Sequence, residues 1–242
     1  MKLIAPDYYP SFTCIASACR HTCCVGWEID VDKDSLERFR RDEVVYSEID
    51  ETDTPHIRLR EGERCPFLNP DGLCDMILKH GEGYLCDICR DHPRFRNYFT
   101  DRTEIGLGLV CEEAARIILF SPEPMRLITL EDDGKKEDIP EDEMWLSDLR
   151  DSLLSDVKET GPRARLLEYL IYRHLPDALY DGRTEERISF IGHSFEEITS
   201  LWDASDGKPE TVTEIVRQWS YDVEYDEEEL EKRIAREEKK DK

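Results

Sequence analysis

Apolar residues recur at spacings of three and four along the second half of the chain. This spacing places them on one face of a helix, and such a face packs into a protein core. We therefore predict an all-helical domain over residues 141–225, without metal or cofactor. The four apolar faces are formed by Leu149, Leu153 and Val157; by Leu166, Leu167, Leu170 and Ile171; by Ile188, Ile191, Phe195, Ile198 and Trp202; and by Val212, Ile215, Val216 and Trp219.

The first half of the chain has no apolar pattern of comparable length. Asp34 followed by Glu37 has the spacing of a capping box and predicts a short helix. Residues 56–60 alternate like a short strand, and residues 110–118 carry one apolar helical face. The expected fold is mainly α, with an irregular, cysteine-rich, metal-binding N-terminal half and at most one small β-hairpin.

The expected domain organisation follows from these patterns. Residues 1–122 form the cysteine-rich metal or iron–sulfur domain, and Pro122 and Pro124 end its last helix. Residues 131–143, which are almost all charged or turn-forming, predict a linker or exposed loop before the helical domain. Residues 226–242 form a charged tail, expected to be a frayed helix or disordered.

Charge excludes several classes of partner. The 242 residues carry 33 Lys and Arg against 57 Asp and Glu, a formal net charge of -24. Nucleic acids and anionic membrane surfaces require an excess of basic residues. No apolar run is long enough to span a membrane, and the N-terminus has no apolar secretory segment. We therefore expect a cytoplasmic protein without a nucleic acid or membrane partner.

Cysteine usage is the most informative feature of the composition. All nine cysteines lie within the first 111 residues. An odd number of cysteines without a secretory segment argues against a disulfide scaffold, and clustered thiols in a reducing compartment usually bind metal. The nine are Cys14, Cys19, Cys23, Cys24, Cys65, Cys74, Cys86, Cys89 and Cys111.

The cysteines form two groups along the sequence. Residues 14–24 hold four of them on an irregular segment that can wrap a metal, and the neighbours Cys23 and Cys24 rarely bridge each other. In the second group, the turn sequence of residues 69–72 brings Cys65 toward Cys74. The group ends in a Cys-x-x-Cys pair at residues 86–89, without the βαβ pattern of a thioredoxin around it.

The spacing leaves the identity of the metal open between zinc and iron–sulfur. Thiolates suit both, and His21 or His92 could replace one thiolate in a zinc site. The spacing matches neither a zinc ribbon nor the bacterial ferredoxin run.

Four sequence blocks follow one another along residues 8–120. They are Phe12-Thr13-Cys14-x4-Cys19-Arg20-x2-Cys23-Cys24-Val25-Gly26-Trp27; Cys65-Pro66-Phe67-Leu68-Asn69-x2-Gly72-Leu73-Cys74; Cys89-Arg90-x2-Pro93-Arg94; and Leu107-x-Leu109-x-Cys111-x-Glu113. In this order, the four blocks resemble the flagellin lysine-N-methylase family. A broader group of cysteine-cluster proteins, thought to chelate zinc or iron, has a related pattern.

This resemblance implies a cysteine-bound [4Fe-4S] cluster and methyl transfer from S-adenosylmethionine to lysine side chains of flagellin. Cys86 fits the family pattern least well, and eight candidate ligands exceed the four that one cluster needs. The alternative is a non-catalytic zinc- or iron-binding protein. The ligands implied by the resemblance are Cys14, Cys19, Cys23, Cys24, Cys65, Cys74, Cys89 and Cys111.

The residues themselves give little independent support for methyl transfer. Glu104–Gly108 is similar to the glycine-rich turn of nucleotide-binding folds, but Val110 stands where a third glycine is needed. We interpret this segment as a β-bend or the lead-in to a helix. Asp7, Tyr8 and Tyr9 could line a methyl-transfer site, although packing is the commoner role of such aromatic residues. No catalytic residue is identified.

Overall fold

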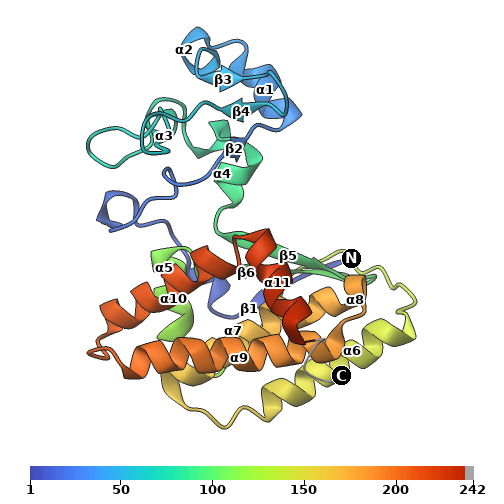
Figure 1. The fold of residues 1–242 in the computed structure, drawn as a ribbon. Helices are drawn as coiled ribbons and strands as arrows, with labels where there is room; N and C mark the ends of the chain where they lie inside the picture. The colour runs from blue at the N-terminus through green and yellow to red at the C-terminus, as the bar shows by residue number, and fades with distance from the viewer. Residues whose placement is uncertain (238–242) are drawn as a thin grey trace. The chain divides into compact units, whose positions relative to one another are not determined.

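The computed structural model describes residues 1–237, which form two compact units (Figure 1). Cys14–His92 form the first, which we call the thiol unit. Met1–Thr13 together with the chain from Pro93 onward form the second, which we call the helical unit. The chain therefore passes between the units twice, and neither passage lies near the expected boundary at residue 122.

A four-stranded sheet begins the helical unit, in the order β5-β6-β1-β7. The strands β1 and β6 are parallel, whereas β5 with β6 and β1 with β7 form antiparallel pairs. The N-terminus of the chain is thus paired with segments about a hundred residues away in sequence. The strands are β1 (Lys2–Pro6), β5 (Arg94–Tyr98), β6 (Arg102–Leu107) and β7 (Leu127–Asp132).

This sheet corrects the expectation of at most one small hairpin. Its strands carry charged residues that suggest a loop, yet Glu104 of β6 is fully buried. Its carboxylate binds the guanidinium of Arg102 at 2.7 Å and that of Arg150 at 3.0 Å. A buried carboxylate is tolerated when it is paired in this way. Gly106, within the same strand, also corrects our interpretation of this segment as a bend.

From residue 141 onward the described chain is helical, as the apolar spacing predicts. Figure 1 shows these helices gathered beneath the sheet, with α7 and α9 side by side. The segment 131–143 is only partly a loop, because β7 includes its first two residues and α6 its last three. The helices of this unit are α5 (Glu112–Leu119), α6 (Glu141–Ser155), α7 (Gly161–His174), α8 (Ala178–Asp181), α9 (Thr184–Asp203), α10 (Pro209–Val223) and α11 (Glu227–Glu237). The 3-10 turns are η1 (Tyr9–Ser11) and η4 (Leu175–Asp177).

Residues 226–237 are more ordered than expected. The expected charged tail includes α11, whose Ile234 is buried in the core of the helical unit. Residues 238–242 of that tail lie outside the described residues. No helix among residues 1–237 combines the length and apolar character needed to cross a membrane.

Glu224 ties the helices together from inside the core. Its side chain is fully buried and accepts hydrogen bonds from Tyr169, at 2.9 Å, and from Ser220. His174 Nε2 lies 2.8 Å from the same carboxylate. Burial alone would raise the pKa of Glu224, but the hydrogen bond and charge of His174, together with Arg173, lower it below its usual value.

The thiol unit contains only short regular elements. Its sheet has the order β2-β4-β3, and each strand has two residues. The expected helix at residue 34 is present, but Asp32 rather than Asp34 caps it, by accepting the Ser35 N–H at 2.8 Å. The elements are η2 (Ala16–Ala18), β2 (Ile29–Asp30), α1 (Lys33–Phe39), α2 (Glu43–Tyr46), β3 (Ile49–Asp50), β4 (His56–Ile57), α3 (Asp75–His80), η3 (Glu82–Tyr84) and α4 (Asp87–Asp91).

We predict that Glu224→Gln lowers the free energy of unfolding of the helical unit by about 2 kcal/mol, because buried donors lose their charged acceptor. The pKa of Glu224 is lowered on folding, so its contribution is present above about pH 4.3 and is lost as the pH falls through the folded value. Urea unfolding at pH 7 and below pH 4 measures both effects. Exposed Glu227→Gln is the control, and equal effects of the two variants would contradict this assignment.

Candidate metal centre

Cysteine side chains form part of the core of the thiol unit. Cys65 is 5% exposed and Cys86 is 1% exposed, and both pack among apolar residues such as Phe67. Cys24, Cys74 and Cys89 are half-buried and pack against the same core. The fold therefore gathers five thiols from three separate stretches of the sequence. We call these five residues the thiol cluster.

The turn at residues 69–72 positions two members of the cluster, as the sequence predicts. The Asn69 side-chain oxygen accepts the N–H groups of Asp71 and Leu73, each at 3.0 Å. Leu68 and Cys74 then pair as an isolated β-bridge, and Cys65 lies three residues before Leu68. Because the turn reverses the chain between them, the two cysteines face one core.

A shared carboxylate fixes the Cys-x-x-Cys pair. Cys86 is the N-cap of α4, so Cys89 lies within the first turn of that helix. Asp32, the cap of α1, also accepts the N–H of Asp87 at 2.8 Å. One side chain thus joins the beginnings of α1 and α4, and holds Cys86 against the core.

Backbone contacts bring the first cysteine group to the same place. The N–H of Cys65 donates to the carbonyl of Cys24 at 2.8 Å. The indole of Trp27 donates to the carbonyl of Cys23 at 2.7 Å, and its ring lies 5.8 Å from that of His92. These contacts hold residues 23–27 beside Cys65.

The thiols perturb one another strongly. Hydrogen bonds from Cys23 and Cys65 hold the pKa of Cys24 well below its usual value. The hydrogen bond between Cys24 and Cys65 also raises the pKa of Cys65. The hydrogen bond between Cys86 and Cys89 likewise lowers the pKa of Cys86 and raises that of Cys89. Within each pair, the thiol with the lowered pKa is therefore the one that ionises first.

The remaining predicted ligands are placed differently. Cys14 and Cys23 are exposed, and Cys19 is partly exposed, on the segment before the thiol cluster. Cys23 still reaches Cys24 through the hydrogen bond described above. Cys111 caps α5 in the helical unit, so it belongs to a different unit from the other eight cysteines. Cys86, which fits the family pattern least well, is the most buried cysteine of the described chain. Its Cys-x-x-Cys spacing with Cys89 is the sequence feature that indicates a ligand.

The donor chemistry of the thiol cluster fits an iron–sulfur cluster or zinc, because thiolates are the soft ligands that both require. The arrangement is one of thiol pairs. Among residues 1–237, no three His, Cys, Asp or Glu side chains converge as ligands of one ion. A four-iron cluster takes its thiolates at separate iron atoms, whereas zinc needs all its sulfurs about 2.3 Å from one point.

The glycine-rich strand has a packing explanation. A Cβ atom on Gly106 would collide with the ring of Phe95, and one on Gly108 would lie 2.7 Å from the Tyr225 hydroxyl. Gly106 is thus required by the buried ring of Phe95, whereas Gly108 lies against a half-exposed tyrosine. Tyr8 is likewise buried in the core, and the Tyr9 hydroxyl accepts a hydrogen bond from Arg94 at 2.9 Å.

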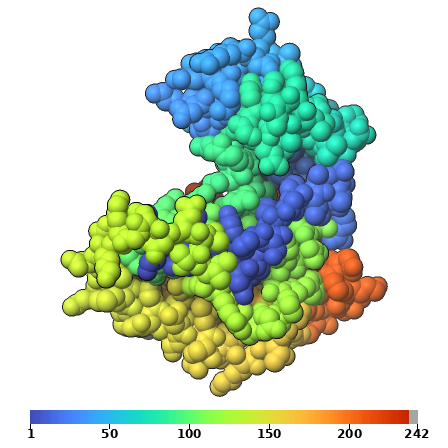
Figure 2. All heavy atoms as spheres, turned by 180° about the vertical axis from the view of Figure 1, so that it is seen from behind, coloured from blue at the N-terminus to red at the C-terminus, as the bar shows by residue number. Residues whose placement is uncertain are grey.

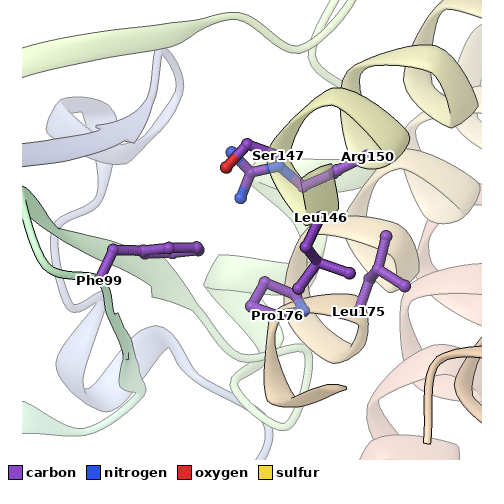
Figure 3. A pocket seen from close by; sticks show the side chains of 6 residues that line it. All are labelled: Phe99, Leu146, Ser147, Arg150, Leu175 and Pro176. Atoms are coloured by element: carbon purple, nitrogen blue, oxygen red, sulfur yellow. The ribbon is translucent and has the colours of Figure 1, made fainter. Parts of the chain in front are cut away.

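A small hollow lies between the end of β5 and the helices (Figure 3). Phe99 faces Leu146 and Pro176 across it, and the guanidinium of Arg150 lies at its side. The hollow does not admit a water molecule. It therefore reflects imperfect packing and offers no room for a methyl donor.

Comparison with known proteins finds relatives that match about half of the chain. Two proteins named Lysine-N-methylase, from Salmonella typhimurium and Salmonella choleraesuis, are each 28% identical to it over 134 residues, which is 50% of this chain and 33% of each relative. The expected family resemblance is confirmed. A Flagellar biosynthetic protein FliU from Salmonella muenchen is 27% identical over 134 residues, covering 50% of this chain and 79% of that protein.

The extent of this similarity is limited. The matched part of the chain spans about a third of the length of the lysine-N-methylases. No family model matches the chain, and no solved structure matches it. For the lysine-N-methylases, the similarity therefore concerns one part of a longer protein.

We predict that Cys24→Ser and Cys86→Ser each strongly reduce the metal content of protein purified without oxygen, whereas Cys14→Ser does not. Serine replaces a soft thiolate with a protonated hydroxyl, which is a poor ligand for iron and zinc. Cys14 is the matched control because it is exposed and lies outside the thiol cluster. Elemental analysis measures the outcome, and metal loss on Cys14→Ser with retention on Cys86→Ser would contradict the cluster.

Proposed function

We propose that the chain is an iron–sulfur-containing protein-lysine N-methyltransferase that acts on flagellin with S-adenosylmethionine as methyl donor. The observation that carries this proposal is the gathering of five thiols in one core, in a chain similar over half its length to proteins named Lysine-N-methylase. The name of the FliU relative, which is a flagellar biosynthetic protein, supports flagellin as the substrate.

The thiol cluster would hold the [4Fe-4S] group. Cys24, Cys65, Cys86 and Cys89 form its two hydrogen-bonded pairs, and Cys74 lies close enough to interact with Cys24. When bound, the group would supply positive charge that offsets these thiolates and would fix the segments that carry them. The turn at residues 69–72 and the Asp32 carboxylate hold the thiols in place before binding.

Transfer of a methyl group to lysine requires a particular state and geometry of the substrate amine. The lysine nitrogen must be neutral to attack, and the donor must lie in line with it. Burial or neighbouring positive charge lowers the pKa of an amine and so favours its neutral form.

We predict transfer of labelled methyl groups to lysines of purified flagellin by the anaerobically purified chain. The same protein should absorb near 400 nm, as thiolate-bound iron clusters do. Cys24→Ser should lose both properties, while Cys14→Ser retains them. Mass spectrometry of flagellin locates the modified lysines. Metal binding without transfer would favour the alternative, a non-catalytic zinc- or iron-binding protein.

We also predict that metal affinity rises steeply with pH. The pKa values of Cys65 and Cys89 are raised, so both thiols carry a proton near neutral pH that a metal must displace. Release of about two protons makes the affinity rise about a hundredfold for each pH unit below those pKa values. Zinc titrations of reduced protein between pH 6 and pH 8 test this, and an affinity that does not change with pH would contradict it.

A further inference from the structure

Helix α6 presents an outer face that no other part of the described chain covers. Trp145 and Met144 are 56% and 47% exposed. The opposite face of the helix is the one that packs, because Leu146 and Arg150 are buried. Figure 1 shows α6 at the periphery of the helical unit, and Figure 2 shows the yellow-green residues of this stretch at the surface.

Carboxylates surround the exposed tryptophan. Glu141 and Asp142 lie four and three residues before Trp145, and Asp148 lies three residues after it. Residues at these separations are neighbours on one helical face. All three are exposed, and none of them forms an ion pair with another described residue. An exposed indole ring therefore has carboxylates on both sides of it along the helix.

Some carboxylates on other helices of the unit are paired locally. Glu214 pairs with Arg217 at 2.7 Å in α10, and Glu229 pairs with Lys232 at 2.6 Å in α11. The single basic residue of α6, Arg150, is instead buried against Glu104. The outer face of α6 therefore combines exposed apolar surface with carboxylates that form no ion pair with another described residue, a combination that suits a cationic partner.

We propose that the outer face of α6 is the docking surface for an extended, lysine-bearing segment of the protein substrate. A lysine stem packs on the indole ring, and its ammonium group interacts with both the ring face and a carboxylate. Opposite charge also steers such a segment toward the surface. This inference deepens the proposed function, and rests on it, by naming where the substrate protein is held.

The test measures binding of the full chain to a synthetic peptide in which lysine alternates with serine, by titration calorimetry at low salt. We expect Trp145→Ala, and separately Glu141→Gln with Asp148→Asn, to weaken binding about fivefold each. The same peptide with acetylated lysines should not bind. Circular dichroism spectra of the variants establish that α6 remains folded.

Two matched controls separate this face from general attraction to an acidic protein. Glu227→Gln with Glu228→Gln makes the same change of net charge on exposed residues of α11, and Leu201→Ala removes an exposed apolar side chain of α9. If these control variants bind the peptide within about twofold of the unsubstituted chain, the proposal is supported. It is overturned if the controls weaken binding as much as the α6 variants, or if the unsubstituted chain does not bind the peptide.

Failure of this inference and failure of the proposed function have different signatures. If flagellin is not methylated but the α6 variants still selectively weaken peptide binding, the docking surface stands and the methyltransferase assignment fails. If flagellin is methylated and the α6 variants bind peptide like the unsubstituted chain, only the docking surface is wrong.

Discussion

Close packing of thiols within a small core is the constraint on which the thiol unit depends. Two of the twelve buried residues in that core are cysteines, and three more cysteines pack against it. Hydrogen bonding between the thiols lowers the pKa of Cys24 and of Cys86, so one thiol of each pair ionises more readily in a largely apolar setting. A bound metal would offset the charge of such thiolates.

The size of the unit makes this constraint stronger. A domain of 79 residues buries a modest fraction of its surface, and domains of this size often need a disulfide or metal to supplement the core. The longest helix of the thiol unit has seven residues, and its strands have two residues each. The helical unit, by contrast, has a continuous core of ordinary aliphatic and aromatic side chains and helices of up to twenty residues.

The sequence predicts the two halves of the fold unequally well. Regular apolar spacing locates α6, α7, α9 and α10, because each buries one face in a common core. The four-stranded sheet is missed because its pairings are distant in sequence and because Glu104 reads as a surface residue. Only the fold brings Arg150 to that carboxylate, from 46 residues away. The cap at Asp32 is missed for a related reason, since Asp34 offers an equally good local pattern.

For the candidate site, the sequence predicts the residue types and the turn that joins Cys65 to Cys74. It does not predict which cysteines meet. Membership of the thiol cluster depends on packing, which includes the buried Cys86 and places Cys111 in the other unit. The fold also decides which acidic residues are paired. Glu214 lies against Arg217, whereas Asp148 stands near the exposed Trp145 without an ion pair to another described residue.

Hydrogen exchange, compared between anaerobically purified protein and the same protein after reduction and chelation, tests the central claim most directly. If metal binding by the thiol cluster organises the thiol unit, chelation removes amide protection from residues 14–92 and leaves the sheet and helices of the helical unit protected. Unchanged protection in residues 14–92 after complete metal removal would contradict the account, as would equal loss of protection in both units.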